Sequence, residues 1–135
     1  MITYRTGNDI GLDEMVELYV DSTLGERRPV GDRARMARML QEAQLVITAW
    51  DESLLVGISR CVTDWVYCTY LSDLAVRADH QGQGIGKELV RLTCETTPEA
   101  TVILLAAPAA VDYYPKIGMT RHESAWIFRP GEKPL

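Results

Sequence analysis

The chain has 135 residues, of which 47% are hydrophobic and 24% are charged. This size and composition predict one globular domain, residues 1–135, and exclude disordered, collagen-like and coiled-coil chains. The net charge of −5 is opposite to that of most proteins that neutralise nucleic-acid phosphates, and no apolar run could span a bilayer. We therefore expect a cytoplasmic monomer or homodimer that binds neither nucleic acid nor membrane.

The pattern of hydrophobic residues predicts both helices and strands along the chain. Helices are recognised by apolar residues three and four positions apart, and strands by β-branched and aromatic runs between turn residues. In chain order we expect strand 2–5, helix 12–23, loop 25–29, a helix from Asp32 to Ala43, strands 45–50, 54–62 and 66–76, helix 84–96, strand 101–106, helix 109–116, and a final strand pair within 119–129. This order predicts an α/β fold (α+β, mixed sheet), in which a central, mostly antiparallel sheet has helices on both faces.

The cysteines and histidines do not indicate a metal site or a disulfide framework. Three cysteines, none in a CxxC spacing, are interpreted as buried or idle thiols. The two histidines, His80 and His122, are too far apart in the sequence to suggest a ligand pair, so we expect no metal.

The most informative segment is a glycine-rich loop, Gln-Gly-Gln-Gly-Ile-Gly-Lys at residues 81–87, between a predicted strand and a predicted helix. The first turn of a helix has N–H groups without partners and a partial positive charge. Glycines at positions 82, 84 and 86 remove the Cβ atoms that would keep a phosphate away from those amides. The loop therefore predicts a pyrophosphate cradle, to which Lys87 or Arg77 adds charge. The alternative is a flexible glycine-rich turn.

Two common nucleotide-binding motifs do not fit this loop. A Walker loop requires a glycine where this chain has Gln81, and a serine or threonine where it has Glu88. A dinucleotide fingerprint requires its third glycine where this chain has Lys87, and it belongs after an early strand of a parallel unit.

Two segments carry a resemblance to a known family. Gln81-x-x-Gly84-x-Gly86, preceded by Leu74-Ala75-Val76, resembles the acyl-CoA-binding motif of the GNAT superfamily of N-acyltransferases. Residues 113–119, Tyr-Tyr-Pro-Lys-Ile-Gly-Met, are similar to the Phe-Tyr-Glu-Lys-Leu-Gly-Phe segment of that family. The separation of the two segments and the order of elements also match, so the resemblance implies a GNAT-like fold over the whole chain.

The resemblance implies an acetyl-CoA-dependent N-acetyltransferase that acts on a small-molecule amine by direct attack in a ternary complex. A protein or peptide amine is the alternative acceptor, and a non-catalytic acyl-CoA-binding module is the alternative function. The strand main chain would bind pantetheine and the loop amides would bind the pyrophosphate. The implied cofactor-binding residues are Leu74, Ala75, Val76, Gln81, Gly82, Gln83, Gly84, Ile85, Gly86 and Lys87.

Tyr114 matches the tyrosine that the family places near the cofactor sulfur. A phenol with a pKa of ~10 can give a proton to the departing thiolate, so the resemblance implies a general acid. Ring packing on the sheet is the structural alternative. The chain has Ala107 where many members have an asparagine that helps to hold the cofactor.

The residue that takes the proton of the amine is less clearly marked, because no glutamate occupies the strand positions where the family often has a basic group. Ser72 and Asp73 are the candidates on this strand, and a structural hydrogen bond to loop amides is the alternative for Asp73. Side chains of a regular strand alternate between its faces. The alternation predicts two sets, Tyr70, Ser72, Leu74 and Val76 on one face and Leu71, Asp73 and Ala75 on the other.

Acceptor binding in this family usually involves the loop between the first two helices and the loop before the last strand, here residues 25–29 and 120–124. The substrate-binding candidates come from the first of these loops. Glu26, Arg27 and Arg28 lie there, and Tyr70 is a further candidate on the third long strand. The arginines would bind a carboxylate or phosphate of the acceptor, whereas Glu26 would bind a cation. The alternative for these residues is a solvated surface loop.

Overall fold

The computed structural model describes residues 1–135, which form two compact units, Met1–Leu105 and Ala106–Leu135. The first unit holds the sheet and the three longer helices, and the second holds two short helical turns. The elements of the first unit are β1 Ile2–Thr6, α1 Leu12–Asp21, η1 Leu24–Arg27, α2 Arg33–Glu42, β2 Leu45–Asp51, β3 Leu54–Thr63, β4 Cys68–Val76, η2 Ala78–His80, α3 Ile85–Thr96 and β5 Thr101–Ile103, where η marks a 3₁₀ turn. Those of the second are η3 Pro108–Ala110 and α4 Tyr113–Lys116.

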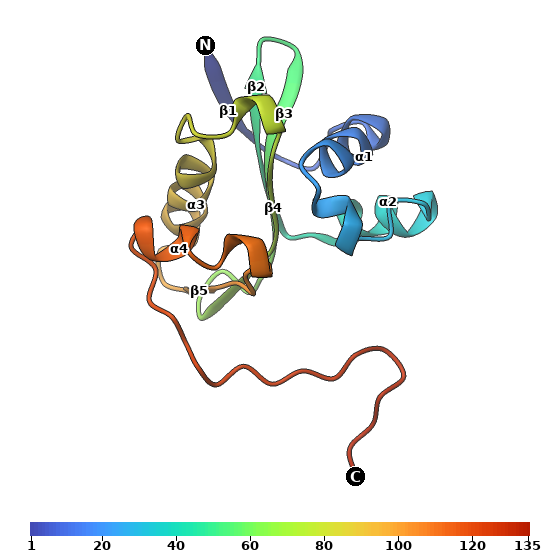
Figure 1. Ribbon diagram of the computed structural model, residues 1–135, viewed down its shortest axis with the longest axis vertical. Helices are drawn as coiled ribbons and strands as arrows, with labels where there is room; N and C mark the ends of the chain where they lie inside the picture. The colour runs from blue at the N-terminus through green and yellow to red at the C-terminus, as the bar shows by residue number, and fades with distance from the viewer. The chain divides into compact units, whose positions relative to one another are not determined.

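The five strands form one sheet in the order β1-β2-β3-β4-β5 (Figure 1). The first four pair antiparallel with their neighbours, and β5 lies parallel to β4. A short turn joins the antiparallel strands β2 and β3, and Glu52 in this turn adopts a φ of 55°. The mixed, mostly antiparallel sheet confirms the fold class predicted from the sequence.

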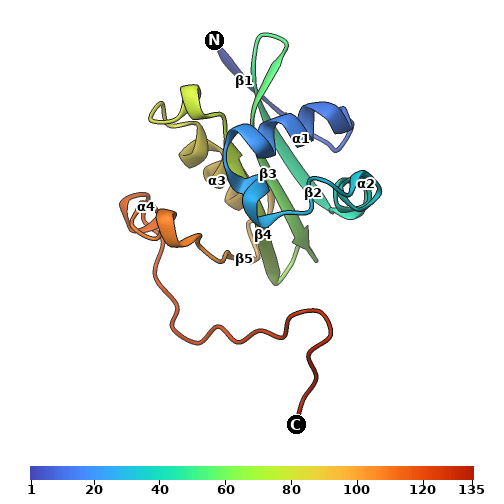
Figure 2. The same ribbon diagram turned by 45° about the vertical axis from the view of Figure 1, so that its right-hand side comes forward.

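Helices cover both faces of the sheet, with α1 and α2 on one face and α3 on the other (Figures 1 and 2). Asp32 caps α2 as predicted, because its carboxylate accepts the Arg35 N–H at 3.1 Å. The face under α1 and α2 has a continuous apolar core, including Met15, Leu18, Met36, Leu40, Leu55, Ile58 and Ala75. Burial of this apolar surface is the main force that holds the helices on the sheet.

Helix α3 lies close to β3 because a glycine faces it. A Cβ on Gly57 would approach Leu89 Cδ1 to 3.1 Å and Ile85 Cγ2 to 3.2 Å, tighter than most side chains tolerate. Ser59 Oγ also contacts Thr93 Oγ1 at 2.8 Å, two residues further along β3. These contacts fix the start of α3, and so the glycine-rich loop before it, against the sheet.

The sequence predicted too much regular structure after α3. Strand β5 ends at Ile103, the expected helix at 109–116 is divided into η3 and α4, and no strand forms between residues 119 and 135. The prediction of a final strand pair was wrong: the apolar side chains of Trp126 and Phe128 in that segment are 92% and 65% exposed. A strand requires a hydrogen-bonded neighbour, which sequence alternation alone does not supply. No helix of the chain is long and apolar enough to cross a membrane.

Candidate active site

The second half of β4 has a strand partner on one side only. Strand β3 pairs with β4 as far as Val76, whereas β5 pairs with it only at Cys68, Thr69 and Tyr70. The main chain from Leu71 to Val76 is therefore open on the β5 side. The three residues expected to bind pantetheine, 74–76, lie in this open stretch, where the side chains at 74 and 76 are half-buried.

The glycine-rich loop follows β4 and leads into α3. Gly84 is the N-cap of the helix, and Gly82 and Gly84 have φ values of +78° and +83°, in the left-handed region that favours glycine. A Cβ on either glycine would meet no atom within 4 Å. The space in front of the loop is therefore not filled by the first unit's own side chains.

Apart from the Gln81 amide, which donates to the Ala78 carbonyl at 3.4 Å, the amides of this loop have no acceptor within the chain. The first hydrogen bond of α3 runs from the Glu88 N–H to the Gly84 carbonyl at 3.0 Å, and no hydrogen bond is made by the amides from Gly82 to Lys87. Unpaired amides at a helix N-terminus are donors to anions, particularly phosphate groups. The residues present thus fit the pyrophosphate of a nucleotide-like carrier.

The base of the loop is held by side chains. Arg77 donates from Nε to the Leu55 carbonyl and from a terminal nitrogen to Glu17, both at 2.8 Å. The Gln81 side chain donates to the Val76 carbonyl at 3.0 Å. Arg77 was predicted to add charge at the phosphate and Gln81 to bind through its amide only, so these side-chain contacts add to what was predicted.

His80 joins the loop to the end of β2. Its Nε2 lies 2.9 Å from Asp51 Oδ2 and its Nδ1 lies 2.7 Å from Asp79 Oδ1. Carboxylates accept but do not donate, so both ring nitrogens donate when the imidazole is doubly protonated. The hydrogen bonds to Asp51 and Asp79 accordingly raise the pKa of His80.

A β-bulge at Ser72 changes which way the side chains of β4 face. Arg60 of β3 lies opposite Asp73, but the next residue, Cys61, lies opposite Leu71, so Ser72 has no partner. The extra residue reverses the alternation on its far side. The predicted facing of residues 70 to 72 was therefore wrong: Tyr70 lies on the face of Asp73, under α1 and α2, and Leu71 lies on the face of α3. Ser72 also lies on the face of Asp73, because its hydroxyl accepts from Arg60 at 3.0 Å and donates to Asp73 at 3.3 Å.

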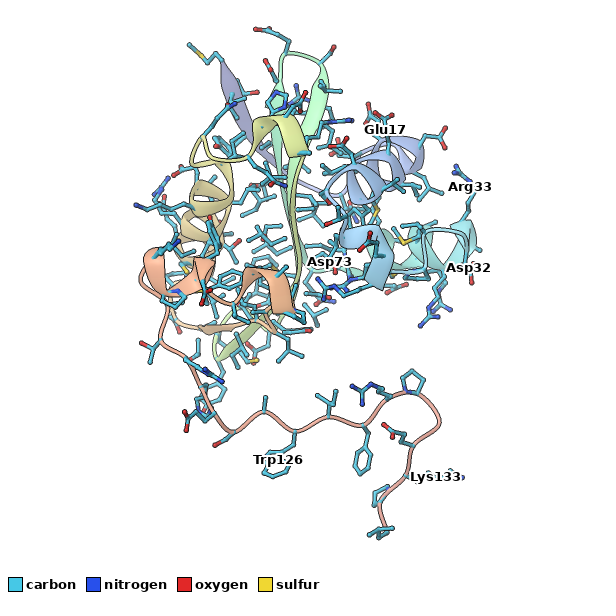
Figure 3. The ribbon with its side chains drawn as sticks, in the orientation of Figure 1. Glu17, Asp32, Arg33, Asp73, Trp126 and Lys133 are labelled. Atoms are coloured by element: carbon cyan, nitrogen blue, oxygen red, sulfur yellow. The ribbon has the colours of Figure 1, made fainter.

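Asp73 is the centre of a buried polar cluster on this face (Figure 3). Its side chain is fully buried, and one carboxylate oxygen accepts from Tyr19 Oη at 2.6 Å and from Arg60 Nε at 2.5 Å. The other oxygen accepts from Arg28 Nε at 2.6 Å and from Ser72 Oγ at 3.3 Å. We refer to Tyr19, Arg28, Arg60 and Asp73 as the Asp73 cluster.

The charges of the cluster keep Asp73 ionised. Burial alone would raise the pKa of Asp73, but the hydrogen bonds and charges of Arg60, with Tyr19 and Arg28, outweigh it and lower the pKa. Burial and the neighbouring carboxylate raise the pKa of Tyr19 well above its ordinary value, so the phenol stays neutral. A carboxylate with a lowered pKa and four donors around it is a poor proton acceptor. The contacts favour the structural interpretation of Asp73, with side-chain donors in place of the expected loop amides.

Sequence reasoning missed Tyr19 and Arg60 as members of this cluster. They lie 54 and 13 residues from Asp73 in the sequence, on a helix and on another strand. One signal was available, because Arg60 is the one charged residue of the strand Leu54–Thr63, and an arginine is rarely buried without an anionic partner.

The candidate acceptor residues differ in how much of each side chain is available. Glu26 and Arg27 are exposed, whereas Arg28 is half-buried and bonded to Asp73 and to the Ser72 and Arg27 carbonyls. Tyr70 lies between Val62 of β3 and Ile103 of β5 in the sheet register. The cluster thus brings Arg28 together with Ser72 and Asp73, while Arg27 stays free for a ligand.

Tyr114 lies in α4, in the second unit. Its carbonyl accepts the Ile117 and Met119 amides at 3.2 and 3.1 Å, which closes the helix at Gly118 with a φ of +95°. The ring of Tyr113 lies edge-to-face with that of Tyr114 at 5.3 Å. Ala107 is the N-cap of η3, and its carbonyl accepts the Ala110 N–H at 2.8 Å.

Comparison with known proteins agrees with this geometry. A curated relative of Prochlorococcus marinus, described as an uncharacterized N-acetyltransferase that is ycf52-like, is 28% identical over 112 residues, which cover 78% of this chain and 61% of the relative. The chain therefore spans less than two thirds of that relative's length. A solved GNAT-family acetyltransferase of Streptococcus pneumoniae has 25% identity and a TM-score of 0.75, with 96% of this chain and 99% of that chain covered.

A probable acetyltransferase of Staphylococcus aureus shares the fold, with a TM-score of 0.80 at 20% identity over 96% of this chain and 98% of that chain. The family model described as acetyltransferase (GNAT) family matches residues 12–119, which include the glycine-rich loop, the open half of β4 and α4. This chain belongs to the GNAT acetyltransferase family.

Proposed function

We propose that the chain is an N-acetyltransferase that uses acetyl-CoA to acetylate the primary amine of a small molecule. The observation that carries this proposal is the run of unbonded amides from Gly82 to Lys87 beside the open half of β4. Acetyl-CoA, when bound, supplies an activated thioester. We also propose that both compact units belong to one domain, because the family match at residues 12–119 crosses their boundary.

The two halves of the carrier would be held by different main-chain groups. The amides of Gly82, Gln83, Gly84, Ile85 and Gly86 would donate to the pyrophosphate, with the exposed ammonium of Lys87 adding charge. The predicted amide role of Gln81 does not fit, because its N–H already donates to the Ala78 carbonyl at 3.4 Å. The open main chain of Leu74, Ala75 and Val76 would bind pantetheine as an added strand does. The Ala75 side chain packs in the core, so only its backbone is offered to the carrier.

Proton transfer is assigned to two hydroxyl groups. Tyr114 Oη would give a proton at the thiol end, and its support is the match between residues 113–119 and the family segment. At the amine, the half-buried Ser72 hydroxyl at the bulge is the group proposed to relay the proton to water. Its oxygen accepts only from Arg60, at 3.0 Å, and its bond to Asp73 is long at 3.3 Å, whereas both oxygens of Asp73 are occupied by short bonds from their donors. An alkylammonium with a pKa of ~10.4 must lose this proton before it can attack.

The acceptor is proposed to be a small molecule that contacts Arg27, Glu26 or Tyr70. Solved structures with this fold include an aminoglycoside acetyltransferase in complex with sisomicin and a ribosomal-protein-alanine N-acetyltransferase. The fold therefore accommodates both acceptor classes, and the choice rests on Arg27. Its side chain is exposed and makes no hydrogen bond, so it can meet an anionic group of a small acceptor.

The test has two steps. Calorimetry with acetyl-CoA measures carrier binding, and thiol release is then followed with sisomicin, spermidine, L-lysine and a peptide with an N-terminal alanine. We expect acetyl-CoA to bind and at least one small amine to be acetylated faster than the peptide. Preference for the peptide would support the protein-amine alternative, and binding without any turnover would support a non-catalytic module.

A further inference from the structure

We propose that Asp73 is a positioning residue: through Arg28 it fixes the loop between α1 and α2, residues 22–32, against the bulge of β4. This inference rests on the proposed function in one respect, namely that the loop faces the acceptor. The fixation itself is a property of the free protein and can be measured without turnover.

The hydrogen bonds that join the loop to the sheet come from a single side chain, Arg28. Its other hydrogen bonds are local, for example from Glu26 N–H to the Thr23 carbonyl and from Asp32 N–H to the Pro29 carbonyl. Arg28 crosses to β4, where Nε donates to Asp73 at 2.6 Å and a terminal nitrogen donates to the Ser72 carbonyl at 2.8 Å. Apart from burial of Leu24 and packing of Val30 against the core, the position of the loop depends on this guanidinium.

Asp73 is itself fixed by the elements on either side of the loop. Tyr19 reaches it from α1, before the loop. Arg60 reaches it from β3 and also donates to the Met39 carbonyl of α2, after the loop, at 3.2 Å, and to Ser72 Oγ at 3.0 Å. The Asp73 carboxylate is therefore linked to both helices, to the loop and to the bulge, directly or through Arg60.

The charges of the cluster determine which substitution would release the loop without destabilising the fold. Two guanidinium groups face one carboxylate, and Tyr19 is neutral, so the cluster carries one excess positive charge. Replacement of Asp73 would leave two cations without a partner and would destabilise the fold. Replacement of Arg28 instead leaves the neutral pair Arg60–Asp73 in place, so Arg28→Met should fold and should release the loop alone.

The first measurement is hydrogen exchange on the free protein. In Arg28→Met we expect amide exchange in residues 22–32 to rise about tenfold, while β3 and β4 stay protected. The matched control is Arg38→Met, which removes an exposed arginine of α2 that makes no hydrogen bond. Unchanged exchange in the loop of Arg28→Met, or equal changes in both variants, would overturn the proposal.

The second measurement separates positioning from mere stability. With the best amine of the panel above as the probe, Arg28→Met should raise KM for the amine about tenfold, with kcat and acetyl-CoA affinity little changed. Arg28→Lys should restore part of the loss, because an ammonium can reach Asp73 but cannot bond Ser72 as well. A released loop with unchanged KM would refute the role toward the acceptor. If no amine is acetylated, the exchange result alone decides the fixation, whereas failure of acetyl-CoA to bind would count against the proposed function only.

Discussion

The Asp73 cluster and the glycine-rich loop differ in whether their polar groups have hydrogen-bond partners within the chain. In the Asp73 cluster, both carboxylate oxygens are occupied and no side-chain polar atom is left buried without a partner. In the glycine-rich loop, the amides from Gly82 to Lys87 make no hydrogen bond within the chain. The comparison teaches that satisfied groups hold the scaffold, whereas unpaired exposed donors are the ones available to a ligand.

The largest expected effect is the loss of acetyl-CoA binding on substitution within the glycine-rich loop, whose amide donors from Gly82 to Lys87 are unpaired. Gly84→Asp should abolish acetyl-CoA binding, because a carboxylate would stand in front of amides that are proposed to receive a pyrophosphate and because Gly84 has a φ of +83°. Calorimetry measures this loss. Gly131→Asp is the matched control, since Gly131 has a φ of +88° and open space around its Cβ position. Equal affinity in both variants would remove the loop from the proposed site.

The next effect is on turnover. Tyr114→Phe should lower kcat by ~10²–10⁴ with acetyl-CoA affinity unchanged, since it removes a proton donor and keeps the ring. Steady-state kinetics of thiol release checks this, and Tyr113→Phe serves as the control. Wild-type turnover in Tyr114→Phe would show that the hydroxyl is not the acid.

A substitution in the Asp73 cluster, whose polar groups all have hydrogen-bond partners, should change the stability of the fold. Asp73→Asn should lower the free energy of unfolding by about 3–5 kcal/mol, because it leaves the buried guanidinium of Arg60 and the half-buried one of Arg28 without a charged partner. In contrast, Asp13→Asn breaks an exposed pair with Arg33 and should cost less than about 1 kcal/mol. Denaturant unfolding of both variants compares the two values. A loss at Asp73 as small as that at Asp13 would contradict the account of the cluster.

The smallest effect is expected from pH at His80, which joins the loop to β2. Its pKa is raised above the ordinary value of 6.5 by Asp51 and Asp79. The contact therefore stabilises the fold fully below that ordinary value, and its contribution is lost as pH rises through the higher pKa of the folded state. We expect acetyl-CoA affinity to fall a few-fold over this range, by calorimetry. His80→Gln should flatten the change, and a profile unaltered by this substitution would exclude His80 as its source.

Much of the fold was predictable because local patterns determine it. Helical spacing gave α1, α2 and α3, and Asp32 capped α2 as predicted. The bulge at Ser72 was not predictable, since an unpaired residue leaves no mark on the alternation of a strand. The final strand pair failed for a related reason: residues 119–129 have a strand-like composition, but strand formation depends on a neighbour.

The candidate site likewise has one part that could be predicted from the sequence and one part that could not. The glycine-rich loop could be predicted because its chemistry lies within seven consecutive residues. The Asp73 cluster could not, because Tyr19, Arg28 and Arg60 meet Asp73 only after α1, its following loop and β3 have packed. Arg28 was predicted as a free binding residue because the sequence does not show that its guanidinium already has a partner.

The most direct test of the central claim is an amide NMR titration of the whole chain with coenzyme A. Our account predicts that the amides of Gly82–Lys87 shift most, as they gain acceptors they lack in the free protein, while those around Asp73 stay nearly constant. Saturable shifts that leave the loop unmoved, or no shifts at millimolar coenzyme A, would contradict it.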